Sequence, residues 1–173
     1  MLSSLFQSER LLCRRWIADD FEPLYALYSD PESMRYVGNG QPISKARCEE
    51  WFTVTKANYA RRGYGMFALV HLRSGQVVGF AGLVHPGGQA EPEVKYAFLR
   101  SYWGMGFASE VVPRLLEYGA TVHGLHRIVA TVAPGNAASQ RVLVKAGMGL
   151  AHQRQNDDGS TTLVYQWPAQ SAA

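Results

Sequence analysis

The chain has 173 residues, a length that fits one domain, and its composition of 47% hydrophobic and 18% charged residues is sufficient for a buried core. Its 17 basic and 14 acidic residues give a formal charge of +3 and are scattered, with Arg14-Arg15 and Arg61-Arg62 as the adjacent basic pairs, so binding of nucleic acid is not indicated. The N-terminus lacks the basic-then-apolar pattern of a signal peptide and the longest apolar stretch, 77–84, is too short to span a membrane, so we expect a cytoplasmic protein without membrane contact.

The N-terminal third predicts a strand followed by helices. The strand is expected at 10–17, after which Asp19 and Glu22 have the spacing of a helix-capping box. Asp30-Pro31 resembles a cap followed by a proline in a first helical turn, and Ser44 is placed to cap a longer helix. Two helices are therefore expected before the main part of the sheet.

The middle of the chain predicts three strands. The ranges 66–72 and 77–84 flank a turn of hairpin composition, and the nearly unbroken apolar character of the second range indicates burial on both faces. The third strand is expected at 93–99. We place 77–84 at the centre of the sheet.

The C-terminal part predicts an amphipathic helix, then a strand at 127–133, a short helix at 136–146 and a hairpin at 148–167. Cys13 and Cys48 lie far apart without metal-ligand spacing, so we expect reduced, packed thiols and no bound metal. The order of elements predicts an α/β domain in which a mixed sheet is covered by helices.

The stretch Tyr102-Trp103-Gly104-Met105-Gly106-Phe107-Ala108 joins the strand at 93–99 to the amphipathic helix. Glycines let the backbone approach an anion closely, and the N–H groups at the helix start point toward it with the positive end of the helix dipole behind them. The turn is typical of a phosphate site, and also of an ordinary strand-to-helix connection. Rossmann-type nucleotide binding is not indicated, because the acidic residue needed about twenty residues further on is missing around Leu125.

Several further motifs follow one another in a specific order. They are Glu9-Arg10-Leu11-Leu12 with Arg14, Ser29-Asp30-Pro31-Glu32 with Met34-Arg35-Tyr36, Val78-Gly79-Phe80-Ala81-Gly82-Leu83, Glu93-Val94-Lys95-Tyr96, the glycine turn, and Asn136-Ala137-Ala138-Ser139 leading to Lys145-Ala146-Gly147-Met148. With these motifs the chain resembles, over nearly its whole length, the GNAT superfamily of acyl-CoA-dependent N-acyltransferases, and within it the branch of ribosomal-protein-alanine N-acetyltransferases. The resemblance implies a single domain, residues 1–173 with a core of about 9–168. It also implies a twisted, mostly antiparallel sheet of about seven strands and about four helices, with a splayed central strand pair.

The resemblance implies that acetyl-CoA is the cosubstrate. Backbone N–H groups of the turn would cradle its pyrophosphate, and main-chain groups at the end of the preceding strand would pair with the pantetheine arm. Trp103 takes a place where the wider superfamily has Gln or Arg, and Met105 takes one that is usually basic. The cofactor-binding residues implied in this way are Phe98, Leu99, Arg100, Trp103, Gly104, Met105, Gly106, Phe107, Ala108 and Asn136.

The catalytic residues are inferred from the chemistry of amine acetylation. An amine must lose a proton to attack a thioester, so a general base or a water leading to one is needed. The resemblance favours Glu93 as this base, and His85 is the alternative. The departing thiolate needs a hydrogen-bond donor, and since Leu143 stands where many relatives have tyrosine, this branch implies Ser139.

Two functions from different classes agree with these patterns. The first is an enzyme that moves an acetyl group from acetyl-CoA to a primary amine, either a protein N-terminus or a small molecule. The second is a CoA-binding domain without catalysis that acts as a sensor or scaffold, which Leu143 leaves open. The sequence does not identify the acceptor or the acyl length, and the exposed edge of the final hairpin is compatible with a homodimer.

Overall fold

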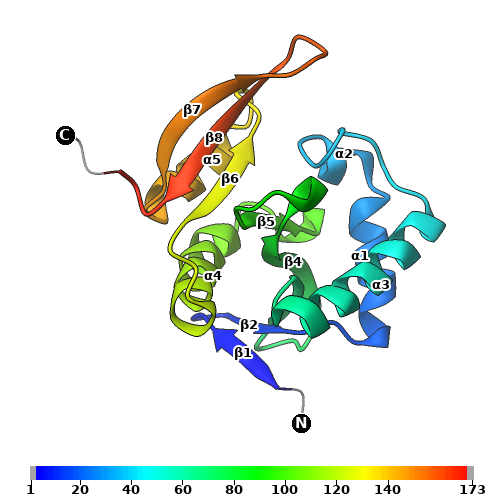
Figure 1. Ribbon diagram of the computed structural model, residues 1–173. Helices are drawn as coiled ribbons and strands as arrows, with labels where there is room; N and C mark the ends of the chain where they lie inside the picture. The colour runs from blue at the N-terminus through cyan, green and yellow to red at the C-terminus, as the bar shows by residue number, and fades with distance from the viewer. Residues whose placement is uncertain (1–2, 171–173) are drawn as a thin grey trace.

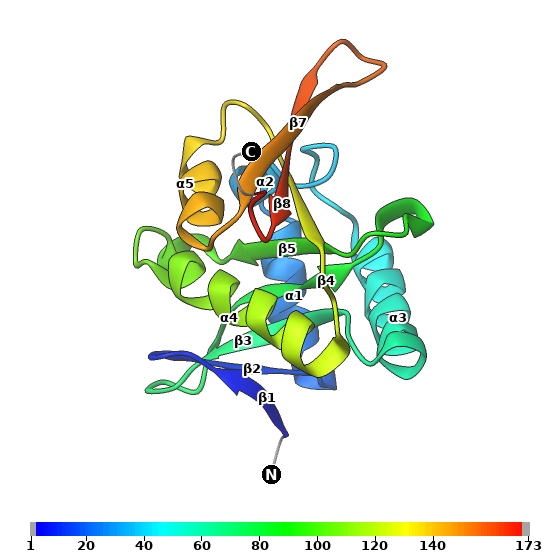
Figure 2. The same cartoon turned by 60° about the vertical axis from the view of Figure 1, so that its left-hand side comes forward.

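The computed structural model describes residues 3–170, which form one eight-stranded sheet with helices on both faces (Figures 1 and 2). The strand order is β1-β2-β3-β4-β5-β6-β8-β7. The strands are β1 Ser4–Gln7, β2 Leu11–Arg14, β3 Met66–His71, β4 Val77–Val84, β5 Glu93–Phe98, β6 Ile128–Val132, β7 Gly149–Gln155 and β8 Thr161–Trp167. The helices are α1 Phe21–Tyr28, α2 Pro31–Met34, α3 Lys45–Arg62, α4 Phe107–His123 and α5 Ala137–Lys145.

The predicted order of elements is confirmed, with two additions that bring the counts to eight strands and five helices in the described residues. Strand β1 was missed because it is a four-residue edge strand with exposed ends that pairs only with β2, so its hydrophobic signal is weak. Helix α2 is a single turn whose cap at Asp30 was predicted, but it is too short to show a helical period and was not counted as a separate helix. Strand β2 also ends earlier than predicted, at Arg14.

Most of the predicted caps form. The Asp30 carboxylate accepts the Ser33 N–H at 3.0 Å, and the Ser44 hydroxyl accepts the Arg47 N–H at 3.2 Å. The capping box expected at Asp19 and Glu22 is wrong, because a short 3-10 turn, Ala18–Asp20, precedes α1. In that turn the buried Asp20 is committed to two Arg14 nitrogens at 2.7 and 2.9 Å and to the Ile17 N–H at 2.8 Å.

The sheet separates two hydrophobic layers. In Figure 1, α4 lies on one side of β4 and β5, and α1 and α3 lie on the other. On one face, α4 packs over β4 and β5, with Val111, Val112, Leu115 and Leu116 almost fully buried. On the other face, α1 and α3 cover β3 and β4 around Phe80, with Leu24, Leu27 and Cys48 in the core. Both cysteines are buried free thiols, as predicted. Within residues 3–170, no helix has the length and apolarity that a membrane crossing requires.

The sheet is divided between β5 and β6. Strand β5 pairs with β4 over six consecutive residue pairs and β6 pairs with β8 over five, but the parallel pair β5–β6 has the single register pair Glu93↔Val129 in the described residues. Beyond this point β6, β7 and β8 lean away from β5, as Figure 1 shows. The predicted splayed strand pair is confirmed, and it leaves one edge of β5 without a neighbouring strand at the centre of the molecule.

Candidate active site

The glycine turn lies at the end of β5 that is farther from Glu93. Gly104 and Gly106 have φ values of +72° and +80°, in the left-handed region that side chains with a Cβ disfavour. Gly106 is the N-cap of α4, and within the described chain no side chain caps this helix. The first N–H groups of α4 are therefore available to an anion, with the helix dipole favouring negative charge there.

The open edge of β5 presents main-chain groups of alternate residues. In an antiparallel pair, neighbouring residues direct their N–H and C=O groups to opposite sides. Since the Leu99 N–H donates to the Val78 oxygen at 2.9 Å, the main-chain groups of Tyr96 and Phe98 are directed away from β4 and toward the gap, whereas the Val94 N–H faces β6 at the Glu93↔Val129 pair. These groups can pair with an extended, amide-containing ligand as a further strand would.

The end of β5 is less open than the sequence predicts. The indole Nε1 of Trp103 donates to the Phe98 oxygen at 2.7 Å, the Tyr102 N–H donates to the Leu99 oxygen at 2.9 Å, and the Trp103 N–H donates to the Arg100 oxygen at 3.1 Å. Both main-chain groups of Leu99 are bonded within the chain, because the chain leaves the strand there and turns into the 3-10 segment Arg100–Tyr102. The Phe98 N–H remains directed toward the gap.

One polar contact crosses the gap on the face of β5 that carries α4. The Tyr96 hydroxyl lies 2.5 Å from the Ser139 Oγ, and the Ser139 N–H donates to the Asn136 Oδ1 at 3.2 Å. Burial raises the pKa of Tyr96, although the Ser139 hydrogen bond lowers it in part, so the phenol is protonated at neutral pH. Leu143 is 1% exposed and belongs to the core.

The sequence did not indicate a functional role for Tyr96. Its position three residues after Glu93 places it on the opposite face of β5. Alternation along the strand could therefore have identified it, but the partner in α5 is 43 residues away and only the fold brings the two together. In the structure the Tyr96 phenol therefore lies beside Ser139, whereas the sequence predicted the Ser139 hydroxyl without this partner.

Glu93 lies on the other face, at the point where β5 and β6 still pair. Its side chain is 3% exposed, and its Oε1 accepts a hydrogen bond from the Thr131 hydroxyl and forms an ion pair with the Lys95 Nζ at 2.7 Å. The Gln89 Nε2 approaches Oε2 at 3.4 Å. Glu93 and Ser139 therefore approach the gap from opposite faces of the sheet.

His85, the alternative base, is engaged at both ring nitrogens. Nε2 lies 2.9 Å from the Tyr64 hydroxyl, and Nδ1 lies 2.9 Å from the Gln89 oxygen. Because the carbonyl oxygen can only accept, Nδ1 carries a proton and donates to it, and the Tyr64 hydroxyl is the hydrogen-bond partner of Nε2. Both candidate bases, Glu93 and His85, are therefore engaged by neighbouring side chains or main-chain groups.

Contacts also connect the two sides of the gap from the α2 region. The Tyr36 hydroxyl, just after α2, donates to the Gly135 oxygen at 3.4 Å, and the Tyr36 ring is 47% exposed. On the β5 side, Arg100 forms an ion pair with Asp30, the residue that caps α2. The segment around α2 is thus attached to both sides of the gap.

Comparison with known proteins agrees with this geometry. A family model described as an acetyltransferase (GNAT) domain matches residues 10–149. The chain is 30% identical over 139 residues to the N-acetyltransferase p20 of Bacillus licheniformis, itself uncharacterized, which covers 79% of this chain and 77% of the relative. A GNAT-family acetyltransferase from Bacillus anthracis superposes with a TM-score of 0.79 at 25% identity, covering 92% and 95% of the two chains. RimL, a ribosomal L7/L12 α-N-protein acetyltransferase solved with coenzyme A, shares the fold with a TM-score of 0.79 at 16% identity over 95% and 97%.

Proposed function

The chain belongs to the GNAT acetyltransferase family, and we propose that it transfers the acetyl group of acetyl-CoA to a primary amine. The observation that carries this proposal is the single-pair junction of β5 and β6, which opens an edge of β5 directly before the glycine turn. A strand edge followed by a helix N-terminus matches a ligand that consists of an amide-rich arm followed by a pyrophosphate.

In this proposal the two parts of coenzyme A occupy adjacent main-chain sites. The N–H groups of the turn at 104–108 hold the pyrophosphate, and the main-chain groups of Tyr96 together with the Phe98 N–H pair with the pantetheine arm. Asn136, which caps α5, lies beside Ser139 and therefore close to the sulfur end. Of the residues predicted for this role, Leu99 contributes through the shape of the turn, since both its main-chain groups are bonded within the chain.

The chemistry is direct attack of the amine nitrogen on the thioester carbon. The new C–N bond forms while the carbonyl oxygen gains negative charge, which a β5 N–H in the gap is placed to stabilise. Collapse of this intermediate breaks the C–S bond, and the thiolate receives a hydrogen bond from Ser139, whose own oxygen is supported by the protonated Tyr96. An acceptor that binds as an ammonium loses one proton to Glu93, directly or through water, before it attacks, and the second proton, released after the C–N bond forms, goes to the departing thiolate.

The ion pair between Lys95 and Glu93 indicates how Glu93 would bind a substrate amine. Its ammonium group is a primary amine held at 2.7 Å from the Glu93 carboxylate, on a side chain that is 40% exposed. An acceptor ammonium has the same charge and donors, so it can replace Lys95 on the carboxylate before it is deprotonated. We therefore infer a cationic primary amine as the acceptor, either a protein N-terminus or a small molecule.

The same ion pair supports a second candidate function. A carboxylate that stays bound to Lys95 does not act as a base, and the domain would then bind coenzyme A as a sensor or scaffold without turnover. The two functions are separated by an assay of free thiol released from acetyl-CoA. The acceptors would be peptides beginning with Ala, Ser or Met, polyamines, amino acids and aminoglycosides. Release with one class supports the enzyme, and CoA binding without release from any amine supports the sensor.

The oligomeric state and the cellular location are further proposals. Strand β7 is an edge of the sheet and most of its residues are exposed, so pairing of two copies along this strand would form a homodimer. Light scattering after gel filtration would measure the mass of the assembly. The two buried thiols suit the reducing cytoplasm.

A further inference from the structure

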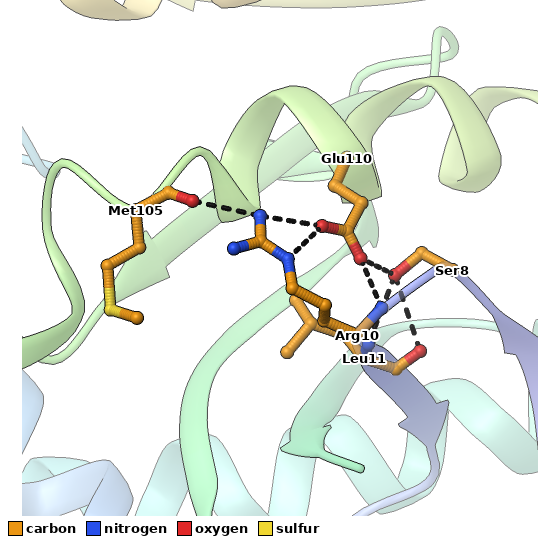
Figure 3. A network of polar contacts seen from close by, with 5 residues as sticks. All are labelled: Ser8, Arg10, Leu11, Met105 and Glu110. Carbon is orange, nitrogen blue, oxygen red and sulfur yellow. Dashed lines mark hydrogen bonds and ion pairs between the residues drawn. The ribbon is translucent and has the colours of Figure 1, made fainter. Parts of the chain in front are cut away.

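A polar network ties the turn between β1 and β2 to the glycine turn and the start of α4 (Figure 3). Glu110, in the first turn of α4, accepts hydrogen bonds from the Ser8 hydroxyl at 2.6 Å and from the Arg10 main-chain N–H at 2.6 Å. It also binds the Arg10 guanidinium, through Nε at 2.8 Å. The same guanidinium donates from Nη2 to the Met105 carbonyl oxygen at 2.8 Å and lies 4.6 Å from the centre of the Phe107 ring.

The hydrogen bond to Met105 determines the direction of one peptide group in the turn. In a trans peptide the C=O and the following N–H point in opposite directions. Because Arg10 holds the Met105 C=O on its own side of the turn, the Gly106 N–H is directed to the other side. This is one of the N–H groups at the helix start that would face a bound pyrophosphate.

The turn depends on such an external contact. Gly104 and Gly106 allow a wide range of backbone conformations, and the Met105 side chain between them is 45% exposed, so packing contributes little to holding this segment. Arg10 binds the middle of the turn from a position 95 residues earlier in the chain. The forked guanidinium suits this role because it donates to the carboxylate and to the carbonyl from a rigid plane.

The contribution of Arg10 is geometric, because its charge is neutralised. Burial raises the pKa of Glu110, but the hydrogen bonds from Ser8 and Arg10 and the charge of Arg10 together lower it below its ordinary value. Glu110 is therefore ionised at neutral pH, and the pair has no net charge. An isolated cation beside a phosphate would act differently, by adding attraction.

We propose that Arg10, held by Glu110, is a positioning residue that fixes the turn at 104–106 in the conformation that binds the pyrophosphate of coenzyme A. This inference rests on the proposed function, since it concerns the same ligand. Arg10 acts through Met105 and does not need to touch the ligand.

The test compares two ligands and two double variants. R10M/E110Q removes the bond to Met105 while the net charge of the pair stays zero, and R114M/E117Q removes a pair on the same helix whose side chains are more than half exposed. Binding of CoA and of pantetheine, which lacks the pyrophosphate, is measured by calorimetry on the full chain. We expect R10M/E110Q to weaken CoA binding by about tenfold or more, tenfold being the lower end of the range for one hydrogen bond to a charged group, and to leave pantetheine binding unchanged. R114M/E117Q should bind both ligands as the wild type does.

Three results would overturn the inference. CoA binding by R10M/E110Q within about twofold of the wild type would show that the turn is formed without Arg10. An equal loss of CoA and pantetheine binding would show general damage to the site. If CoA binding is weakened in the single variant R10M and returns to the wild-type level in R10M/E110Q, the loss comes from the unpaired charge of Glu110 and not from the missing bond to Met105. Failure of the wild type itself to bind CoA would contradict the proposed function, which is a different outcome from these three.

Discussion

Replacement of Gly106 by valine perturbs the backbone of the proposed phosphate site at a position where the added Cβ has room. Gly106 has a φ of +80°, and a Cβ added there would meet the Arg10 Nη2 at 3.6 Å, an ordinary contact distance. The space is therefore available, and the cost lies in the backbone conformation, which a β-branched residue strongly disfavours. We expect G106V to fold and to shift this residue toward negative φ.

The size of the effect follows from the geometry. A left-handed conformation costs a residue with a Cβ roughly 1–2 kcal/mol, which sets the loss of stability if the turn is retained. If the turn relaxes instead, the N–H groups of Gly106 and Phe107 rotate away from the ligand. Each hydrogen bond to a charged group is worth about 1.5–3 kcal/mol, so CoA binding should weaken about 10- to 150-fold for each bond lost.

A second glycine provides the control. Gly159 has a φ of +82° at the tip of the β7–β8 hairpin, with no atom within 4 Å of an added Cβ in the described residues, so G159V carries the same backbone cost far from the turn. Calorimetry with CoA and thermal unfolding would be measured for both variants. We expect similar losses of stability and a loss of CoA affinity in G106V alone. Equal CoA affinity in the two variants would refute the idea that backbone N–H groups of the turn hold the pyrophosphate.

Three further predictions concern protons. Glu93→Gln should leave CoA binding intact and lower turnover on the order of 100-fold, most strongly at acidic pH, where the acceptor amine is most fully protonated; normal turnover at every pH would show that Glu93 is not the base. Tyr96→Phe should lower kcat on the order of 10-fold with little change in CoA affinity, because Ser139 loses the 2.5 Å contact with the phenol; an unchanged kcat would exclude the phenol from thiolate departure. Because the pKa of Glu110 is lower in the folded state than its ordinary value of 4.5, its ionised form stabilises the fold above that pH, and this contribution is lost as the pH falls through the folded pKa. Urea unfolding of the wild type and Glu110→Gln should therefore differ by about 1 kcal/mol at pH 7 and converge in acid, and a difference independent of pH would contradict the assignment.

Local signals in the sequence predicted much of the fold. The cap at Ser44 and the left-handed Gly63 define the two ends of α3, and the turn composition at Asn156 to Gly159 gives the final hairpin. Such signals are short-range, because a cap or a turn depends on residues three or four positions apart. Strand β1 lacks a signal of this kind and was missed.

The site was predicted less completely because its contacts are long-range. The glycine turn is recognisable within seven residues, but its contact with Arg10 spans 95 residues and that of Tyr96 with Ser139 spans 43. The ion pair of Glu93 with Lys95 is local, yet its burial depends on Thr131 in the neighbouring strand. These features depend on which strands lie side by side, and periodicity alone does not contain that information.

In the proposed complex, coenzyme A lies along β5 with its pyrophosphate on the glycine turn. The most direct test is a titration of the isotopically labelled protein with CoA, followed by the amide resonances in nuclear magnetic resonance spectra. We expect the largest shifts at the amides of Gly106, Phe107 and Ala108, together with those of Tyr96 and Phe98. Shifts confined to other parts of the protein, or no shifts at saturating CoA, would contradict it.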